Sequence, residues 1–556
     1  MDARARAPYT RRVSASPDLH GLLRRYWGYH EFRPLQERIV RSLLGGHDVC
    51  VVMPTGGGKS LCYQVPAAML SAKTVVVLSP LIALMQDQVA QLTQVGIPAA
   101  FLNSTLSDRE QFALIRRARE GSYRLLYLSP ERLARQDTIE WLRQVPVSLF
   151  AIDEAHCISE WGHEFRPEYR KLASLREHFP NCPIAAFTAS ATRHVRHDII
   201  EQLCLRDPDK YIASFHRPNL RYVVKKCDAR TQPALLVRAL RAHTTGSVIV
   251  YAPTIARVGQ TVALLEAAGI PAIPYHGKMD ARERRDNQER WMSDEARVLV
   301  GTIAFGLGIN KAAVRAVIHL SLPKSIEQYY QEAGRAGHDG QPADCILLWQ
   351  EFDVGLLTHF IQQIEDPEEK ERAWKRYHAI RHFVDTPVCR HRQICLHFGE
   401  IRKEHSCNAC DVCGCGLEWL DEPVIAARAK RKRKKSPRQR TPAISSNRPS
   451  VILRRADTVG PTKNLVVSPS YPGHPSVPCA DRPSDLFESL RQWRQKTAKE
   501  QNVPAFVVMH DTTLEEICRT RPRTLAELHE VHGIGERKLE MYGNQILDTL
   551  KNSLPS

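Results

Sequence analysis

A glycine loop constrains the fold of this chain more than any other segment. Residues 55–60 read Thr-Gly-Gly-Gly-Lys-Ser, between an apolar run at 49–53 and a helix-compatible stretch at 61–70. The apolar run predicts a buried parallel strand. Glycines let backbone N–H groups approach a phosphate, and the start of a helix adds partial positive charge. The alternative is a glycine turn without a ligand, since Met53 stands where the strict phosphate-loop motif has its first glycine.

The pattern therefore predicts a nucleotide phosphate site. The loop residues would cradle the phosphates, the lysine would reach the β- and γ-phosphates, and the serine hydroxyl would ligate Mg²⁺. These residues are Thr55, Gly56, Gly57, Gly58, Lys59 and Ser60.

Composition sets the wider limits. The chain has 556 residues, 43% of them hydrophobic, and a formal net charge of +17, which favours several domains and a polyanionic partner. Three of the 15 cysteines crowd together near residue 410, which favours reduced thiols and a metal over disulfides. We find no secretory signal and no apolar run long enough to span a bilayer, so we expect a soluble, intracellular protein.

An acidic segment follows the predicted strand at 148–152. Asp153-Glu154-Ala155-His156 stands at the carboxyl end of that strand, where ligands bind in α/β sheets. Asp153 can hold Mg²⁺ opposite the phosphate loop, and Glu154 can polarise the attacking water. Four common residues can also occur together by chance. After a further strand at 184–187, the hydroxyls of 188–192 could bond to the Asp153 segment.

An aromatic loop comes next in the chain. Trp161, Phe165 and Arg166 lie in the stretch 157–167, which contains Gly162 and ends at Pro167, and such side chains can stack on bases and pair with phosphates. The alternative is a loop fixed to the core by its two aromatic rings.

A second α/β unit begins near residue 215. Strands are predicted at 247–251, 298–300 and 316–320, with helices at 258–268 and 281–292. No second glycine-Lys-Ser loop follows, so this unit is predicted to close over a nucleotide held by the first.

The chain resembles the RecQ family of superfamily 2 DNA helicases. The resemblance rests on the glycine loop, the Asp153 segment, the aromatic loop at 161–167, the stretch 305–311 and Phe32-Arg33-Pro34 with Gln36. It implies two RecA-like parallel-sheet domains of the α/β class. By this resemblance Tyr29, Arg33 and Gln36 read adenine, Gln331 contributes to nucleotide binding, and Trp161, Phe165 and Arg166 couple single-stranded DNA to turnover. The catalytic set would be Lys59, Asp153, Glu154, His156 and Arg335.

Two departures from the family concern activity. The family pattern Gln-x-x-Gly-Arg-x-Gly-Arg ends in an arginine that commonly acts as the arginine finger, whereas this chain has His338 there. Neutral histidine cannot replace a guanidinium, so we expect a working but weakened ATPase and a higher kcat in His338→Arg. The winged-helix domain that longer members carry is not recognisable, so the chain resembles a short form of the family.

A cysteine cluster predicts a structural metal. Cys407, Cys410 and Cys413 form two overlapping C-x-x-C pairs, and a tetrahedral zinc needs a fourth ligand. Cys389 fills that place in the family pattern. Competing ligands are Cys395, Cys415, His391, His397 and His405, and an iron–sulfur cluster is the alternative to zinc.

The C-terminal quarter of the chain, from residue 418 on, divides into two parts. Residues 418–481 carry a run of six basic residues at 430–435 and many prolines and serines, which predicts a disordered basic linker. The rest resembles the all-helical HRDC bundle. The predicted domains are 1–20 (disordered), 21–214 and 215–350 (RecA-like), 351–417 (zinc module), 418–481 (linker) and 482–556 (HRDC).

The combined prediction is an ATP-dependent 3′→5′ DNA helicase of repair and recombination that uses ATP, Mg²⁺ and Zn²⁺. Its expected partners are single-stranded and forked DNA, with single-strand-binding or recombination proteins and no membrane. The expected location is the cytoplasm at the nucleoid, or the nucleus in a eukaryote. The alternatives are an RNA helicase and a DNA-binding scaffold with weak ATPase.

Overall fold

The computed structural model describes residues 18–103, 106–162, 164–302, 311–404, 406–415, 417–421, 485–501 and 503–553. All of them belong to one compact unit by their contacts. Most of the predicted N-terminal tail and linker lies outside these ranges, as do His163, His405 and residues 305–310. Within the described residues, no helix is both long and apolar enough to cross a membrane.

The first lobe is built on a seven-stranded parallel sheet with the order β3-β4-β2-β5-β6-β1-β7. Its strands are β1 (Val49–Val52), β2 (Thr74–Leu78), β3 (Ala99–Leu102), β4 (Leu125–Leu128), β5 (Val147–Ile152), β6 (Ile184–Thr188) and β7 (Asp209–Ile212). Its helices are α1 (Leu19–Trp27), α2 (Gln36–Leu44), α3 (Lys59–Met69), α4 (Ile82–Gln94), α5 (Asp108–Arg119), α6 (Pro130–Leu133), α7 (Gln136–Leu142), η1 (Ala155–Ile158), α8 (Pro167–Arg170), η2 (Lys171–Ala173), α9 (Ser174–His178) and α10 (Arg193–Gln202).

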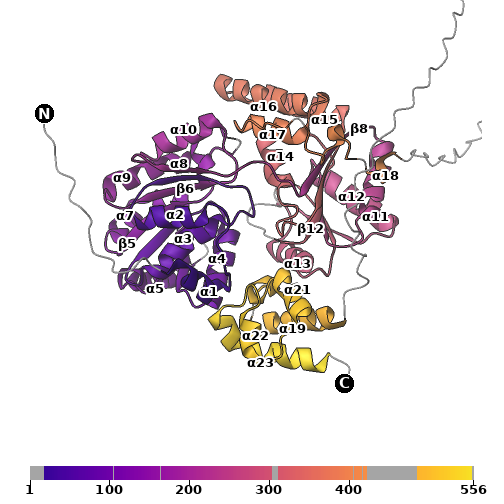
Figure 1. Ribbon diagram of the computed structural model, residues 1–556. Helices are drawn as coiled ribbons and strands as arrows, with labels where there is room; N and C mark the ends of the chain where they lie inside the picture. The colour runs from indigo at the N-terminus through magenta and orange to yellow at the C-terminus, as the bar shows by residue number, and fades with distance from the viewer. Residues whose placement is uncertain are drawn as a thin grey trace, which may run out of the picture. The chain divides into compact units, whose positions relative to one another are not determined.

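Alternation along the strands creates two cores in this lobe. In β1, Val49 and Val51 pack with apolar residues of α2, α3 and α4, whereas Cys50 and Val52 pack on the opposite face with residues of α7, α9 and α10 (Figure 1). Both faces are covered because parallel strands are joined by helical crossovers. Because these strands are parallel and adjacent, the segments that follow β1, β5 and β6 all leave the sheet at the same edge.

The second lobe repeats the design with six parallel strands in the order β10-β11-β9-β12-β13-β8. Its elements are β8 (Leu220–Cys227), α11 (Thr231–Ala242), β9 (Ser247–Tyr251), α12 (Ile255–Ala267), β10 (Ala272–Tyr275), α13 (Ala281–Met292), β11 (Val298–Gly301), β12 (Val314–His319), α14 (Ile326–Ala333) and β13 (Ala343–Gln350). Helices α11 and α12 cover one sheet face. The other face packs with Tyr329 and Tyr330 of α14 and with Phe383 and Phe398 beyond it.

Two helical modules complete the described chain. The cysteine-bearing module comprises α15 (Glu351–Gln362), α16 (Pro367–Asp385), α17 (Arg390–His397), η3 (Asp411–Cys413) and α18 (Glu418–Asp421). The C-terminal bundle comprises α19 (Asp485–Gln501), α20 (Ala505–Val508), α21 (Asp511–Thr520), α22 (Leu525–His529) and α23 (Glu536–Asn552), around its own apolar core. Because α18 is helical, the predicted linker at 418–481 starts too early by at least these four residues.

Candidate functional site

The glycine loop has the geometry of an anion cradle. Gly56 and Gly58 adopt positive φ angles of 78° and 79°, and a Cβ on Gly58 would lie 2.3 Å from Nε2 of Gln36. Helix α3 begins at Lys59 without a side-chain cap, so its first N–H groups face the loop. The Lys59 ammonium donates to the Met53 carbonyl at 3.2 Å, which holds it over the end of β1.

Residues predicted to read adenine lie directly beside this loop. The Gln36 amide donates to the Gly58 carbonyl at 3.0 Å and accepts from the Arg33 backbone N–H at 2.8 Å. The Arg33 guanidinium donates to the Gly56 carbonyl. Arg33 and Gln36 therefore order the phosphate loop in this structure, and adenine contact stays a prediction for both.

Tyr29 has a partner that the sequence did not indicate. Its ring stacks on that of His532 in the C-terminal bundle, with the centroids 4.6 Å apart and the planes 19° from parallel. Burial raises the pKa of the Tyr29 hydroxyl. Nearby, the Gly533 N–H donates to the Gly28 carbonyl at 3.0 Å, and Arg24 pairs with Glu530. The Gly-Ile-Gly turn at 533–535 thus contacts the first lobe.

The acidic segment lies at the carboxyl end of β5, as predicted. Burial raises the pKa of the Asp153 carboxyl to about 7, and the negative charge of Glu154 acts in the same direction. A buried carboxylate beside a second, partly buried one favours a bound cation, which restores the ionised form, so Asp153 fits a Mg²⁺ site. Ser60 as a further ligand of this ion stays a prediction. Glu154 is held in a left-handed backbone conformation with φ of 46°, a strain typical of functional residues.

A polar chain leads from this segment to the second lobe. Nδ1 of His156 lies 3.2 Å from the Glu154 carboxylate and 2.9 Å from the Thr188 hydroxyl. This is the expected bond between the hydroxyls of 188–192 and the Asp153 segment. Two residues further on, the Ser190 hydroxyl accepts from the Gln331 amide of α14 at 3.0 Å. The nucleotide-binding edge of one lobe is thus connected to α14 of the other.

The segment after α14 also faces the glycine loop. A Cβ on Gly56 would lie 2.8 Å from Cδ2 of His338, so the histidine ring touches the loop. Arg335, three residues before His338 in the same segment, is buried, with 9% of its surface exposed. The Arg217 guanidinium donates to the Thr55 carbonyl of the glycine loop at 3.3 Å and to the Gly334 carbonyl at 3.4 Å. The glycine loop and the 334–338 segment therefore converge on one seam.

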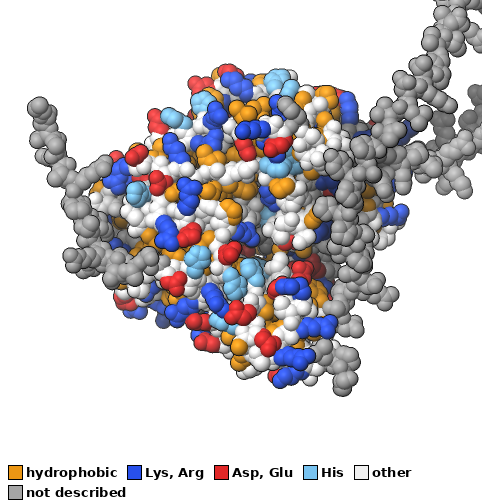
Figure 2. All heavy atoms as spheres, in the orientation of Figure 1, with side chains coloured by type: hydrophobic (Ala, Val, Ile, Leu, Met, Phe, Trp, Pro, Cys, Tyr) orange, Lys and Arg blue, Asp and Glu red, His pale blue; other side chains and the backbone are white. Residues whose placement is uncertain are grey.

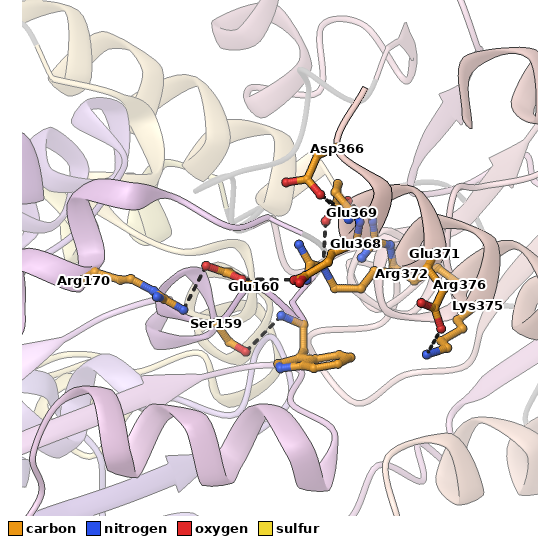
Figure 3. Close-up of polar contacts among 11 residues, drawn as sticks. Ser159, Glu160, Arg170, Asp366, Glu368, Glu369, Glu371, Arg372, Lys375 and Arg376 are labelled. Atoms are coloured by element: carbon orange, nitrogen blue, oxygen red, sulfur yellow. Dashed lines mark hydrogen bonds and ion pairs between the residues drawn. The ribbon is translucent and has the colours of Figure 1, made fainter. Parts of the chain in front are cut away.

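The aromatic loop lies beside helix α16 (Figure 3). Trp161 is 46% exposed, stacks on His194 at 5.1 Å, and has the Arg372 guanidinium 5.8 Å from its ring centroid. Figure 3 shows Glu160 between Arg170 and the charged side chains of α16, and its ion pairs to Arg170 and Arg372 measure 3.1 Å and 3.8 Å. The exposed Trp161 is not fixed in the core, contrary to the structural alternative.

Phe165 and Arg166, the other two predicted DNA-binding residues of this loop, are less exposed than Trp161. The Arg170 guanidinium lies 5.5 Å from the Phe165 ring centroid. Arg166 precedes α8 and donates its backbone N–H to the Cys157 carbonyl at 2.9 Å. DNA contact by Trp161, Phe165 and Arg166 stays a prediction.

The four predicted cysteines come together. Ligand atoms of Cys389, Cys407, Cys410 and Cys413 all lie within 4.8 Å of one another, as four thiolates around one zinc ion require. Of the competitors, His397 bonds to Glu327 at 2.6 Å and His391 bonds to the Arg217 carbonyl at 3.1 Å. Four protein ligands leave no open position, so the metal has a structural role.

Charge on the surface is mixed. Figure 2 shows Lys and Arg side chains interspersed with Asp, Glu and His on the face drawn. The net charge of the chain is therefore not expressed there as one uniform basic patch.

Three contacts made by predicted site residues or the glycine loop were not predicted from the sequence: Arg217 at the glycine loop, His532 on Tyr29 and Arg372 on Trp161. None lies in a motif, and each meets its partner only through the tertiary fold. The only sequence feature that could have indicated them is residue type, because arginine and histidine often bind anions or stack on aromatic rings.

The fold and the site define a nucleotide-dependent motor of superfamily 2, with two RecA-like lobes around one phosphate loop. Comparison with known proteins agrees. Residues 33–198 match the DEAD/DEAH box helicase family, 231–340 the helicase conserved C-terminal domain, 351–414 the RecQ zinc-binding family and 484–550 the HRDC domain.

Relatives extend over almost the whole chain. It is 34% identical to "ATP-dependent DNA helicase RecQ" of Haemophilus influenzae, covering 97% of both proteins. It is 35% identical to the protein of the same name from Bacillus subtilis, covering 95% of this chain and 98% of the relative. Among solved structures, the DEAD-box helicase Mss116 shares the fold at a TM-score of 0.50 and 16% identity, over 62% of this chain and 77% of that one. The chain belongs to the RecQ family of ATP-dependent DNA helicases.

Proposed function

We propose that this protein hydrolyses ATP in the seam between its lobes and uses the lobe motion to move 3′→5′ on single-stranded DNA, unwinding duplex ahead of it. The observation that carries the proposal is the convergence of the Lys59 loop and the 334–338 segment, which Arg217 bridges. The family assignment supports DNA as the substrate. The polarity follows from the family resemblance.

The chemical step is water attack on the γ-phosphorus. Glu154 orients the water and accepts its proton, and the bond from the γ-phosphorus to the β,γ-bridging oxygen breaks to leave ADP and inorganic phosphate. Lys59 and the loop N–H groups hold the phosphates. When bound, Mg²⁺ at Ser60 and Asp153 neutralises charge on the β- and γ-phosphates.

Hydrolysis is coupled to movement through contacts that cross the seam. Gln331 reaches Ser190, and Ser190 lies two residues from the hydroxyl that holds His156. Loss of the γ-phosphate removes the anion that both lobes bind, so the lobes separate. Each closing and opening shifts the second lobe along a strand held by Trp161, Phe165 and Arg166.

The biological setting is repair and recombination of DNA, at the nucleoid in a bacterium or in the nucleus of a eukaryote. Forked DNA is the expected substrate, and single-strand-binding or recombination proteins are the expected protein partners.

The test is ATP hydrolysis with and without single-stranded DNA, comparing wild type with Lys59→Ala and Glu154→Gln. Wild type should be stimulated by DNA, Lys59→Ala should lose nucleotide binding, and Glu154→Gln should bind ATP without hydrolysing it. Duplexes with a 3′ or a 5′ tail test polarity, and RNA in place of DNA tests the RNA-helicase alternative. Equal rates for wild type and Lys59→Ala would leave the DNA-binding scaffold as the function.

A further inference from the structure

The second lobe contributes a neutral residue to the seam where the family pattern has an arginine. Burial lowers the pKa of the His338 ring to about 3, and the positive charges of Arg217, Arg335 and Lys59 act in the same direction. His338 is therefore uncharged at physiological pH. It touches Gly56 but brings no positive charge to the phosphates.

Arg217 places a guanidinium at the same point of the seam. It lies in the connection between β7 and β8, the segment that joins the two lobes. One terminal nitrogen of the guanidinium donates to the carbonyls of Thr55, in the glycine loop, and Gly334. The other terminal nitrogen donates to the carbonyls of Ala336 and Gly337 at 3.3 Å and 3.2 Å. The charge thus bridges the phosphate loop and the segment that carries His338.

The charge of Arg217 is not balanced by an acid. Among the described residues, no carboxylate lies within ion-pairing distance of Arg217 or of the buried Arg335. The four acceptors of Arg217 are neutral carbonyls at 3.2–3.4 Å, the long end of the hydrogen-bond range. Hydrogen bonds from arginine to an anionic oxygen are shorter and roughly twice as strong. An anion on the glycine loop therefore competes well for this guanidinium.

We propose that Arg217 turns from these carbonyls to the terminal phosphate of ATP and supplies the positive charge that His338 cannot. Arg217 makes and breaks no covalent bond; it stabilises the charge that develops on the phosphoryl oxygens as the bond to ADP breaks. Its backbone is anchored for this role, since its carbonyl accepts from Nε2 of His391 at 3.1 Å and from the Leu220 N–H at 3.0 Å. The inference rests on the proposed ATPase function.

The experiment compares Arg217→Ala with Asn219→Ala. Asn219 is the matched control because its amide donates to the same Gly337 carbonyl at 2.9 Å and to Gln341 at 3.0 Å, yet it is uncharged. Steady-state ATPase at saturating single-stranded DNA gives kcat and KM. A fluorescent non-hydrolysable ATP analogue reports ground-state affinity, and ADP with aluminium fluoride reports affinity for a mimic of the transferring phosphoryl group.

Arg217→Ala should lower kcat at least tenfold, and up to about 10³-fold. The affinity for ADP with aluminium fluoride should fall in proportion, while the affinity for the ATP analogue changes less than about threefold. Adding His338→Arg to Arg217→Ala should restore at least tenfold in kcat. The same change in wild type should gain less, because there the new arginine joins three cations.

Three results would overturn the inference: an unchanged kcat in Arg217→Ala, an equal loss in Asn219→Ala, or a loss that His338→Arg does not restore and that tracks a lower melting temperature. The last two would mean that Arg217 only holds the 334–337 carbonyls. A wild type without DNA-stimulated ATPase would defeat the proposed function itself, whereas an active wild type with an equally active Arg217→Ala would defeat this inference alone.

Discussion

Arg372 of α16 holds the aromatic loop, and its removal tests how that loop is controlled. The guanidinium lies 5.8 Å from the Trp161 ring centroid and 3.8 Å from the Glu160 carboxylate. A cation–π contact at a partly exposed site contributes about 0.5–1 kcal/mol, and such an ion pair about 0.2–1 kcal/mol. Together they stabilise the docked loop by about 0.7–2 kcal/mol, which changes its population about 3–30-fold.

The loop must leave α16 if Trp161 is to stack on bases. Arg372→Ala should then lower the Kd for single-stranded DNA, and the DNA concentration for half-maximal ATPase, by about 3–30-fold. The kcat at saturating DNA should not change, because the loop is released in both proteins. Fluorescence anisotropy with a labelled oligonucleotide and ATPase titrations with DNA measure the two quantities.

Two further variants make this prediction sharp. Arg376→Ala is the control, because Arg376 forms its ion pair with Glu369 of the same helix. Glu160→Gln removes the ion pair from the other side and should shift the Kd in the same direction as Arg372→Ala. A higher Kd in Arg372→Ala together with an unchanged Kd in Glu160→Gln would refute the reasoning, since Arg372 would then bind DNA itself.

Three other predictions concern the metal, the bundle and the nucleotide. Cys410→Ser should abolish stoichiometric zinc by mass spectrometry and lower the melting temperature, because a fully buried ligand is lost; retained zinc would contradict the site. Burial lowers the pKa of Lys538 to about 8 from 10.5, so the bundle gains stability as pH rises through that window and loses it as pH falls towards 8. Lys538→Met should stabilise the bundle by about 1–3 kcal/mol at pH 7 and remove this dependence, as hydrogen exchange of the bundle in the full chain can show. His532→Ala should raise the affinity for a fluorescent ATP analogue about 2–10-fold by freeing the Tyr29 ring for adenine, since an aromatic pair contributes about 0.5–1.5 kcal/mol; an unchanged affinity would show that the two do not compete.

Buried strands and helices were predictable where the sequence pattern is strong. The strand at Ser247–Tyr251 and the helix at Ala281–Met292 have the predicted bounds, and the strand predicted at 148–152 begins one residue earlier, at Val147. Each strand is apolar because both of its faces are buried. Strand β7 (Asp209–Ile212) was missed because its sequence is polar at the sheet edge, and β8 was missed because lysines end it. At such positions pairing with a neighbour outweighs intrinsic preference.

The site divides in the same way. Lys59, Asp153 and three of the cysteines lie in local motifs, whereas Cys389 was predicted from the family pattern. The fold brings the four cysteines together as predicted. Arg217 gave no signal, because its meaning depends on three segments that are far apart in the chain. The stack of Tyr29 on His532 joins residues from opposite ends of the described chain. No local pattern specifies such a pair.

The cysteine module also covers the edge strand of the sheet in the second lobe. Strand β8 is the last in its sheet, and there the Tyr222 N–H donates to the Ala409 carbonyl at 3.1 Å while Asp411 accepts from the Val224 N–H. An edge strand that is left uncovered has unpaired backbone groups, which can pair with strands of other molecules. Loss of zinc should therefore cause the protein to aggregate. A metal chelator should make concentrated samples turbid before it lowers their ATPase rate.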